Sequence, residues 1–195
     1  MLSGQSLIRA AELRSVSSEY QRYTTAIGSF RDKYFAIPGD MSNAVSFWGN
    51  TIIGNGDGDG TIESTGTAIG AAGATTSNEI SNFWQHLASA ALIEGSYTVV
   101  ANTTLTAGTN NPRAKLGNAA WNVGGLGTVA ITSTTYYAGT YGNVLYFGSG
   151  TNATTPGVAL KPEEAWNLDT KLDDGKPDLG TVTALESQGN ATAGS

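Results

Sequence analysis

The feature of the sequence that most constrains the fold is a run over residues 3–35 in which apolar residues recur at alternating spacings of three and four. Side chains at this spacing share one face of an α-helix, and polar residues fill the positions between them. The stripe consists of Leu13, Val16, Tyr20, Tyr23, Ile27, Phe30 and Tyr34. On the polar face, Glu19 stands three residues before Arg22 and is predicted to pair with it. The breaker sequence IPGD at residues 37–40 ends the pattern, so we expect one long helix.

A small apolar cluster precedes this stripe and lies outside its register. It consists of Leu7, Ile8, Ala10 and Ala11. One interpretation is that the cluster belongs to a longer helix that has been cut. The alternative is the frayed end of an amphipathic helix, which is common at helix termini.

A second helix is predicted over residues 76–93, where the apolar residues follow the i, i+3, i+4, i+7 pattern. Thr76 and Glu79 have the spacing of a capping box at its start, and Gly95 stands where a C-terminal cap is expected. The aromatic residues of this helix are expected to pack against the tyrosine-rich face of the first one.

The remainder of the chain favours a small antiparallel sheet and one more helix. Residues 97–101, 128–132 and 143–147 are β-rich runs separated by Gly, Asn, Ser and Thr, as in strands joined by loops. Residues 161–172 have a proline and two acids at the start, which is typical of a helix N-terminus. We therefore expect a single α+β domain with the tail over residues 187–195 loose.

The composition excludes several classes of protein. Lys and Arg number 10 against 16 Asp and Glu, a formal net charge of −6, so nucleic acid is not an expected partner. The absence of cysteine excludes disulfides, thiolate nucleophiles and Cys-ligated metals. Charged residues make up only 13%, and small polar residues replace them, as suits a secreted or closely packed protein. No apolar stretch is long enough to cross a bilayer, so the chain as given is predicted to be soluble.

Five segments of the chain, in order, resemble the type IV pilin-like proteins, which carry a prepilin-type cleavage and methylation segment. They are residues 4–14 (GQSLIRAAELR), 30–41 (FRDKYFAIPGDM), 83–87 (FWQHL), 162–171 (PEEAWNLDTK) and 173–177 (DDGKP). The long aromatic helix followed by Pro-Gly-Asp is the more specific part of this resemblance. The Gly-rich middle of the chain adds nothing to it.

The resemblance implies a long N-terminal helix (residues 1–36) packed on a globular head (residues 37–186) that contains a small antiparallel sheet. It also implies a structural subunit of a pilus or of a secretion pseudopilus, with other copies of itself or related pilins as partners. Family members have a preceding apolar run that lies in the bacterial inner membrane before assembly and in the core of a periplasmic or extracellular filament afterwards. That run is not present here, so we expect a truncated chain. Packing in the filament is then expected of Leu7, Ile8, Ala11 and Leu13.

One loop has the chemistry of a cation site. Residues 55–63 (NGDGDGTIE) place oxygen-bearing side chains at alternate positions, and the glycines between them allow the turns that direct each ligand inward. The pattern matches the opening of an EF-hand loop but not its twelfth position, which is Gly66. The candidate Ca²⁺ ligands are Asn55, Asp57, Asp59, Thr61, Glu63 and Glu79. The alternative is an acidic turn without a metal, with Glu79 in the capping box.

Two further features have less specific chemistry. A second acidic group, Asp169, Asp173, Asp174 and Asp178, lies around the end of the third predicted helix, where a cation or Lys171 and Lys176 would offset the unfavourable helix dipole. The single histidine, His86, lies off the apolar stripe, and no motif of a nucleophilic or nucleotide-binding enzyme is present. We therefore expect no catalytic residues. The alternative to a filament subunit is a secreted Ca²⁺-dependent adhesin or ligand-binding module.

Overall fold

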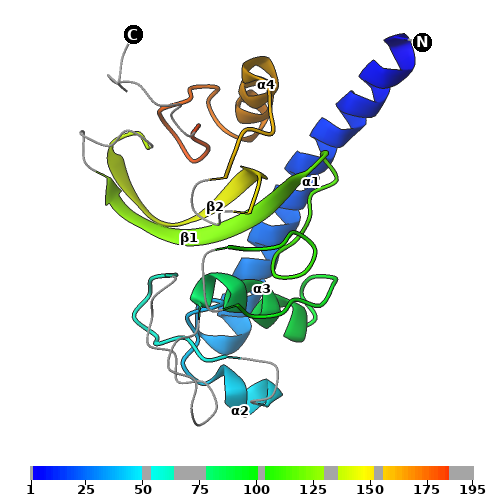
Figure 1. Cartoon of the computed structure of the whole chain (residues 1–195). Helices are drawn as coiled ribbons and strands as arrows, with labels where there is room; N and C mark the ends of the chain where they lie inside the picture. The colour runs from blue at the N-terminus through cyan, green and yellow to red at the C-terminus, as the bar shows by residue number, and fades with distance from the viewer. Residues whose placement is uncertain are drawn as a thin grey trace.

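The computed structural model describes residues 2–49, 54–63, 78–100, 104–129, 136–151 and 156–184. In chain order, the elements of this part are α1 (Leu2–Tyr34), α2 (Ala44–Trp48), α3 (Glu79–Ser89), β1 (Ala119–Val129), β2 (Gly139–Ser149) and α4 (Pro162–Leu172) (Figure 1). The two strands form an antiparallel sheet. The predicted α+β class is therefore confirmed at this level. The tail over residues 187–195 lies outside the described residues.

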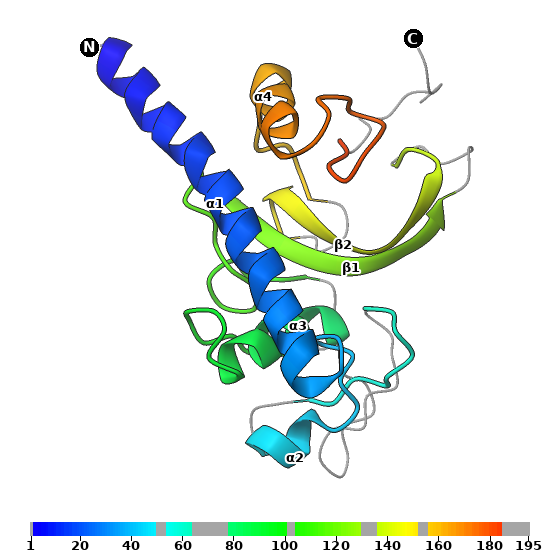
Figure 2. The ribbon, with the colours of Figure 1, turned by 180° about the vertical axis from the view of Figure 1, so that it is seen from behind.

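The predicted long helix is confirmed as α1, which has 33 residues and spans about 50 Å at the α-helical rise per residue. Its C-terminal half is docked on the rest of the chain, and the stripe residues there are buried or packed against the core. Val16, Tyr23 and Phe30 of the stripe are buried, and so is Ala26 beside it. The N-terminal end extends beyond the head in both views (Figures 1 and 2). The helix therefore has a docked half and a largely exposed end.

The sheet is a long curved ribbon that crosses α1 near its middle (Figure 2). Trp121 of β1 pairs with Phe147 of β2, and the register shifts around Gly125 and Gly127. The buried first half of β1 faces the core, while its second half is more exposed. The predicted strand at residues 143–147 lies in β2, and residues 128–129 of the other predicted strand are the end of β1, which begins earlier than expected. Residues 130–132 lie outside the described residues.

The strand predicted at residues 97–101 is wrong, since residues 97–100 have no strand assignment and residue 101 lies outside the described part. The backbone there makes hydrogen bonds with a loop and not with a neighbouring strand. Thr98 N donates to Thr109 O at 2.8 Å, and Asn110 Nδ2 donates to Thr98 O at 2.8 Å. The β-branched run therefore satisfies its backbone groups without joining the sheet.

The second predicted helix is confirmed as α3 but is shorter at both ends. Its N-cap is Asn78, whose side chain accepts a hydrogen bond from Ile80 N at 3.2 Å. Thr76 lies outside the described residues, and the helix ends at the C-cap Ala90, well before Gly95. Residues 79–87 are all buried, so α3 is a central helix without a solvent face. The short α2 was not predicted.

The third predicted helix is confirmed as α4, with a proline in its first turn. The carboxylate of Glu164 accepts from Lys161 N at 2.9 Å and so caps this helix. The same carboxylate receives Arg9 Nε at 2.7 Å and Arg9 Nη2 at 2.6 Å. This bidentate pair lowers the pKa of Glu164 to about 2. A charge-assisted contact therefore links α4 to the exposed end of α1.

Glu19 is only 6% exposed and faces β1, so the predicted pairing with Arg22 is wrong. Its Oε2 accepts from Trp121 Nε1 at 2.7 Å, and its Oε1 accepts from Lys115 N at 3.1 Å. Arg22 instead donates to the hydroxyl of Tyr23 at 2.9 Å. The Trp121 ring also meets Tyr23 edge-on, with 5.6 Å between ring centroids. Glu19 therefore anchors α1 to the sheet through a buried carboxylate with two donors.

This anchor gives a testable prediction for Glu19→Gln. A glutamine presents its own N–H group to one of the two donors, which leaves a buried polar group unsatisfied, so we expect a loss of about 1 to 3 kcal/mol in unfolding free energy. Urea unfolding of the 195-residue chain measures the loss. The matched control is Glu12→Gln, since the Glu12 side chain is 31% exposed and pairs with Arg9 at 3.4 Å. It should change stability by no more than about 0.5 kcal/mol, and equal effects would contradict the anchor.

Candidate metal centre

Two buried carboxylates lie beneath the acidic loop of residues 54–63. Asp40 directly follows the Pro38-Gly39 breaker at the end of α1 and is 5% exposed. Glu79 is the first residue of α3 and is 0% exposed. The breaker and the helix start thus bring two acids, far apart in sequence, to the same side of the core.

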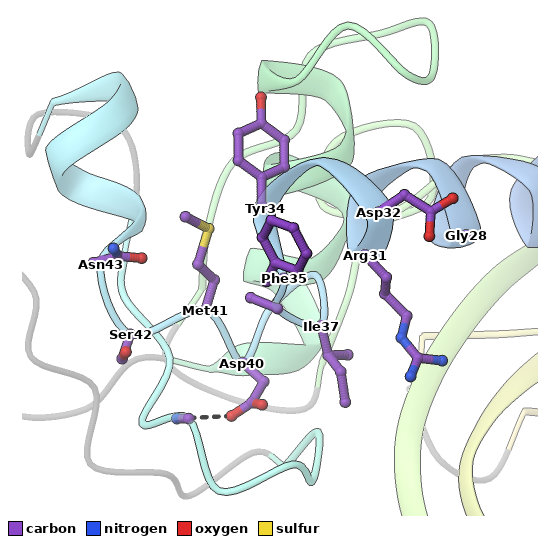
Figure 3. A pocket seen from close by; sticks show the side chains of 12 residues that line it. Gly28, Arg31, Asp32, Tyr34, Phe35, Ile37, Asp40, Met41, Ser42 and Asn43 are labelled. Atoms are coloured by element: carbon purple, nitrogen blue, oxygen red, sulfur yellow. Dashed lines mark hydrogen bonds between the residues drawn. The ribbon is translucent and has the colours of Figure 1, made fainter.

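The loop binds both carboxylates through its backbone. Asp40 accepts from Gly58 N at 2.8 Å and from Gly60 N at 3.1 Å, and Figure 3 shows Asp40 in this position with its hydrogen bond dashed. Glu79 accepts from Asp57 N at 2.9 Å and from Glu63 N at 3.3 Å. Gly58 and Gly60 have φ angles of +82° and +94°, which other residues rarely adopt. The glycines are therefore required for the loop to wrap around the two acids.

The sheet holds the other side of this loop. Asn143 of β2 accepts from Ile62 N at 2.9 Å and donates to Gly60 O at 2.8 Å. Gly125 N of β1 donates to Ile62 O at 2.5 Å. Asn143 was not among the predicted site residues, because no local pattern relates it to a loop so far away in sequence.

The carboxylates converge closely enough to hold a metal ion. Asp40, Asp57 and Glu79 each offer an oxygen, and these three oxygens lie within 4.8 Å of one another. Asp57, Asp59 and Glu63 form a second such group that shares Asp57. Ligand oxygens around one Ca²⁺ at about 2.4 Å are at most about 4.8 Å apart. The spacing therefore suits a hard cation with oxygen ligands.

The electrostatics favour a positive charge at this position. Burial, with a smaller contribution from the charges of Asp40 and Asp57, raises the pKa of Glu79 to about 7 against two backbone hydrogen bonds that lower it. Burial also raises the pKa of Asp40. Since the folded chain holds a proton on Glu79 that the unfolded chain releases, stability is lost as the pH rises from 4.5 to about 7.

The predicted ligands are only partly brought together. Asp57, Asp59, Glu63 and Glu79 belong to the two carboxylate groups. The side chain of Asn55 instead accepts from Val45 N at 2.8 Å, at the start of α2. Thr61 is exposed, and its N–H donates to Asp59 at 2.7 Å. Gly66 lies outside the described residues.

Sequence reasoning assigned Glu79 to a capping box as the alternative and missed Asp40. The Glu79 carboxylate faces the loop, where it accepts from Asp57 N and Glu63 N, so the capping-box alternative is wrong. Asp40 belonged to the recognised Pro-Gly-Asp motif, and an acid directly after a helix breaker was the available signal. The fold was needed to show that it meets the loop.

His86 is buried in α3 and contacts the backbone of two segments of the metal centre, at Gly39 next to Asp40 and at Gly54 where the acidic loop begins. Its Nδ1 accepts from Gly39 N at 2.9 Å, and its Nε2 is 2.8 Å from Gly54 O. Burial lowers the pKa of His86 to about 4, so the ring is neutral at pH 7 and Nε2 donates to the carbonyl. His86 lies off the predicted apolar stripe and is buried all the same, because residues 79–87 of α3 are all buried.

A hollow of about 840 Å³ adjoins this centre and includes Asp40 in its lining (Figure 3). The last turn of α1 and residues 36–43 form most of its wall. Phe35 lies at this edge with 93% of its surface exposed and a φ of +54°, an unusual conformation for a bulky residue. Asp40 therefore belongs both to the carboxylate group and to an open hollow.

Comparison of the chain with models of protein families, with curated proteins and with solved structures finds no match. Among the described residues, no helix is both long and apolar enough to cross a membrane.

Proposed function

We propose that this chain is a structural subunit of a type IV pilin-like filament, either a surface pilus or a secretion pseudopilus, and not an enzyme. The observation that carries the proposal is the division of α1 into a docked half and an exposed end (Figures 1 and 2). Type IV pilin-like subunits need the same division, because the head must fold on one part of the helix while the other part packs against neighbouring subunits.

The exposed end of α1 presents apolar side chains to solvent. Leu7 is 71% exposed and Ile8 is 63% exposed, and Ala11 is exposed as well. Leu13, the fourth residue expected to pack in a filament, is partly buried against the protein's own core. The contact surface that we propose for neighbouring copies therefore consists of Leu7, Ile8 and Ala11.

An ion pair between α1 and α4 fixes the orientation of the exposed end of α1. Arg9 lies between the two exposed apolar residues and Ala11, and its guanidinium holds Glu164 of α4 with both oxygens engaged. Arg9 also donates to Ala159 O at 3.4 Å. A helix end fixed in this way presents Leu7 and Ile8 in a constant direction, which repeated packing in a filament requires.

The remaining parts of the proposal follow the resemblance. The partners are other copies of this chain or related pilins. Only 13% of the residues are charged, which reduces the cost of desolvation when subunits pack. An apolar segment ahead of Gly4 would hold the subunit in a bacterial inner membrane before assembly. The assembled filament would then be periplasmic or extracellular.

We also propose that the acidic loop binds a metal ion and that this ion is Ca²⁺. The ligand set consists of carboxylates from Asp40, Asp57 and Glu79, with Asp59 and Glu63 nearby, and flexible oxygen ligands suit Ca²⁺ better than the strict octahedron of Mg²⁺. The ion would neutralise acids that the fold has buried together. It would also fix the loop between α3 and the sheet, which is a structural role within the head.

The filament proposal predicts that Leu7→Asp/Ile8→Asp prevents assembly without unfolding the head. Both side chains are exposed, so the melting temperature of the 195-residue chain should be unchanged, while charges at the packing surface should lower the yield of sheared filaments from the full reading frame at least tenfold. The control, Gln21→Asp/Thr25→Asp, adds the same charges to exposed positions on the docked half. Normal yield from the first variant, or an equal loss in the control, would contradict the proposal.

The calcium proposal predicts that stability falls as the pH rises without metal and that Ca²⁺ removes this fall. In chelator, raising the pH from 5 to 8 should destabilise the parent chain relative to Glu79→Gln by about 2 to 3 kcal/mol, because the buried Glu79 must lose its proton. Saturating Ca²⁺ should remove this loss in the parent and have a weaker effect on the variant. Denaturant unfolding measures both, with the exposed Glu163→Gln as control. A parent chain whose stability ignores Ca²⁺ at pH 8 would exclude the ion from this loop.

A further inference from the structure

The hollow at the C-terminal end of α1 has the size of a ligand site. Its volume of about 840 Å³ lies within the range of ligand-binding clefts, about 300 to 1,000 Å³. The last turn of α1 and residues 36–43 form most of its wall, and Gly58 of the acidic loop also lines it (Figure 3). Neither the packing surface of Leu7, Ile8 and Ala11 nor the binding of a metal accounts for this hollow.

Phe35, which lines the hollow, combines backbone strain with an exposed aromatic ring. Its φ of +54° lies in the left-handed region, and its N–H donates to Arg31 O at 2.9 Å. This bond closes a helix cap in which glycine is the usual residue, because a side chain strains the backbone there. The ring is 93% exposed, so burial does not offset the strain. A strained residue that gains no packing from its own fold is typical of a binding site.

Four polar side chains that line the hollow are exposed. They are Arg31 and Asp32 on α1, and Ser42 and Asn43 just before α2. No hydrogen bond or ion pair with another described residue engages these side chains, and Asn43 is the N-cap of α2 without a side-chain bond. Figure 3 shows Phe35 between the two pairs. The hollow therefore offers donors and acceptors on both sides of an aromatic ring.

The charges around the hollow favour a neutral ligand. Asp32 and the negative end of the α1 dipole repel an anion. Arg31 repels a cation, as does Lys33, whose ammonium lies 5.1 Å from the centre of the Tyr34 ring. The Asp40 carboxylate is held by two backbone N–H groups of the acidic loop, which offset its charge.

A neutral ligand with many hydroxyl groups fits these side chains best. Its hydroxyl groups can accept from Arg31 and donate to Asp32, while Ser42 and Asn43 can take either part. The C–H face of a sugar ring packs well on an exposed aromatic ring such as that of Phe35. A purely apolar ligand would instead remove the four polar side chains from water without giving them partners.

We propose that the hollow binds a neutral carbohydrate, with one face of a sugar ring packed on Phe35 and its hydroxyl groups bonded to the four polar side chains. The hollow lies at the opposite end of α1 from Leu7 and Ile8, about 40 Å away at the helical rise per residue (Figures 1 and 2). The site therefore does not overlap with the packing surface. It depends neither on the filament proposal nor on a bound metal.

An array of neutral and sulfated oligosaccharides tests the class of ligand with the 195-residue chain. We expect binding to one or more neutral oligosaccharides of hexose or N-acetylhexosamine. Sulfated forms of the same sugar should bind at least tenfold more weakly, because Asp32 and the helix end repel anions. A chain that binds no neutral oligosaccharide at millimolar concentration, or that prefers the sulfated forms, would overturn the proposal.

Phe35→Gly distinguishes a contact with the sugar from a merely structural role. This variant should bind the neutral oligosaccharide selected by the array at least tenfold more weakly than the parent. Its melting temperature should nevertheless rise by roughly 2 to 4 °C, because glycine adopts the left-handed cap without strain. The matched control is Trp166→Ala, which removes an aromatic side chain that is 57% exposed on α4 and should leave the affinity unchanged.

Asp32→Asn tests the polar contacts of the same site. Loss of the carboxylate acceptor should weaken binding of the oligosaccharide at least threefold, whereas Glu163→Gln, exposed on α4, should bind like the parent. Titration followed by nuclear magnetic resonance measures the affinities of all four variants. Parent affinity in Phe35→Gly or Asp32→Asn, or equal losses in the two controls, would overturn the proposal.

Discussion

The fold depends on the docking of one half of α1 against α3 and β1. The stripe that begins at Val16 supplies the apolar contact, and the ring of Tyr23 packs edge-on against both Trp84 and Trp121. Glu19 adds a directional contact, because its carboxylate receives one side-chain donor and one backbone donor from the sheet side. Burial of apolar area fixes the helix on the head, and the carboxylate fixes its rotation and register.

Docking by one half explains the features at both ends of α1. At the C-terminal end, the breaker places Gly39 against α3, where a side chain would lie 2.5 Å from Glu79 O, and the following Asp40 enters the core. His86 joins Gly39 to Gly54, so the helix end and the acidic loop share one support. At the N-terminal end, the Arg9–Glu164 pair is the polar contact that directs the exposed turns.

The sequence was sufficient to predict the elements that depend on local spacing. It was not sufficient for features that depend on contacts between residues far apart in the chain. The periodicity of α1 and the start of α4 were sufficient, because spacing and first-turn residues determine a helix without reference to partners. The strand expected at residues 97–101 did not form, since Asn110 satisfies the backbone of Thr98 from a loop. Asp57 and Glu79 were predicted from ligand chemistry, whereas Asp40 joins them only through the fold. Glu19 looked like a surface residue because neither Lys115 nor Trp121 is near it in sequence.

A helical reconstruction of assembled filaments tests the central claim, that the exposed end of α1 exists to be covered by other copies. The account predicts that residues 4–12 lie in the filament interior, with Leu7 and Ile8 in contact with neighbouring helices and the curved ribbon of β1 and β2 farther from the axis. A filament in which residues 4–12 remain open to solvent while the heads alone make contact would contradict it.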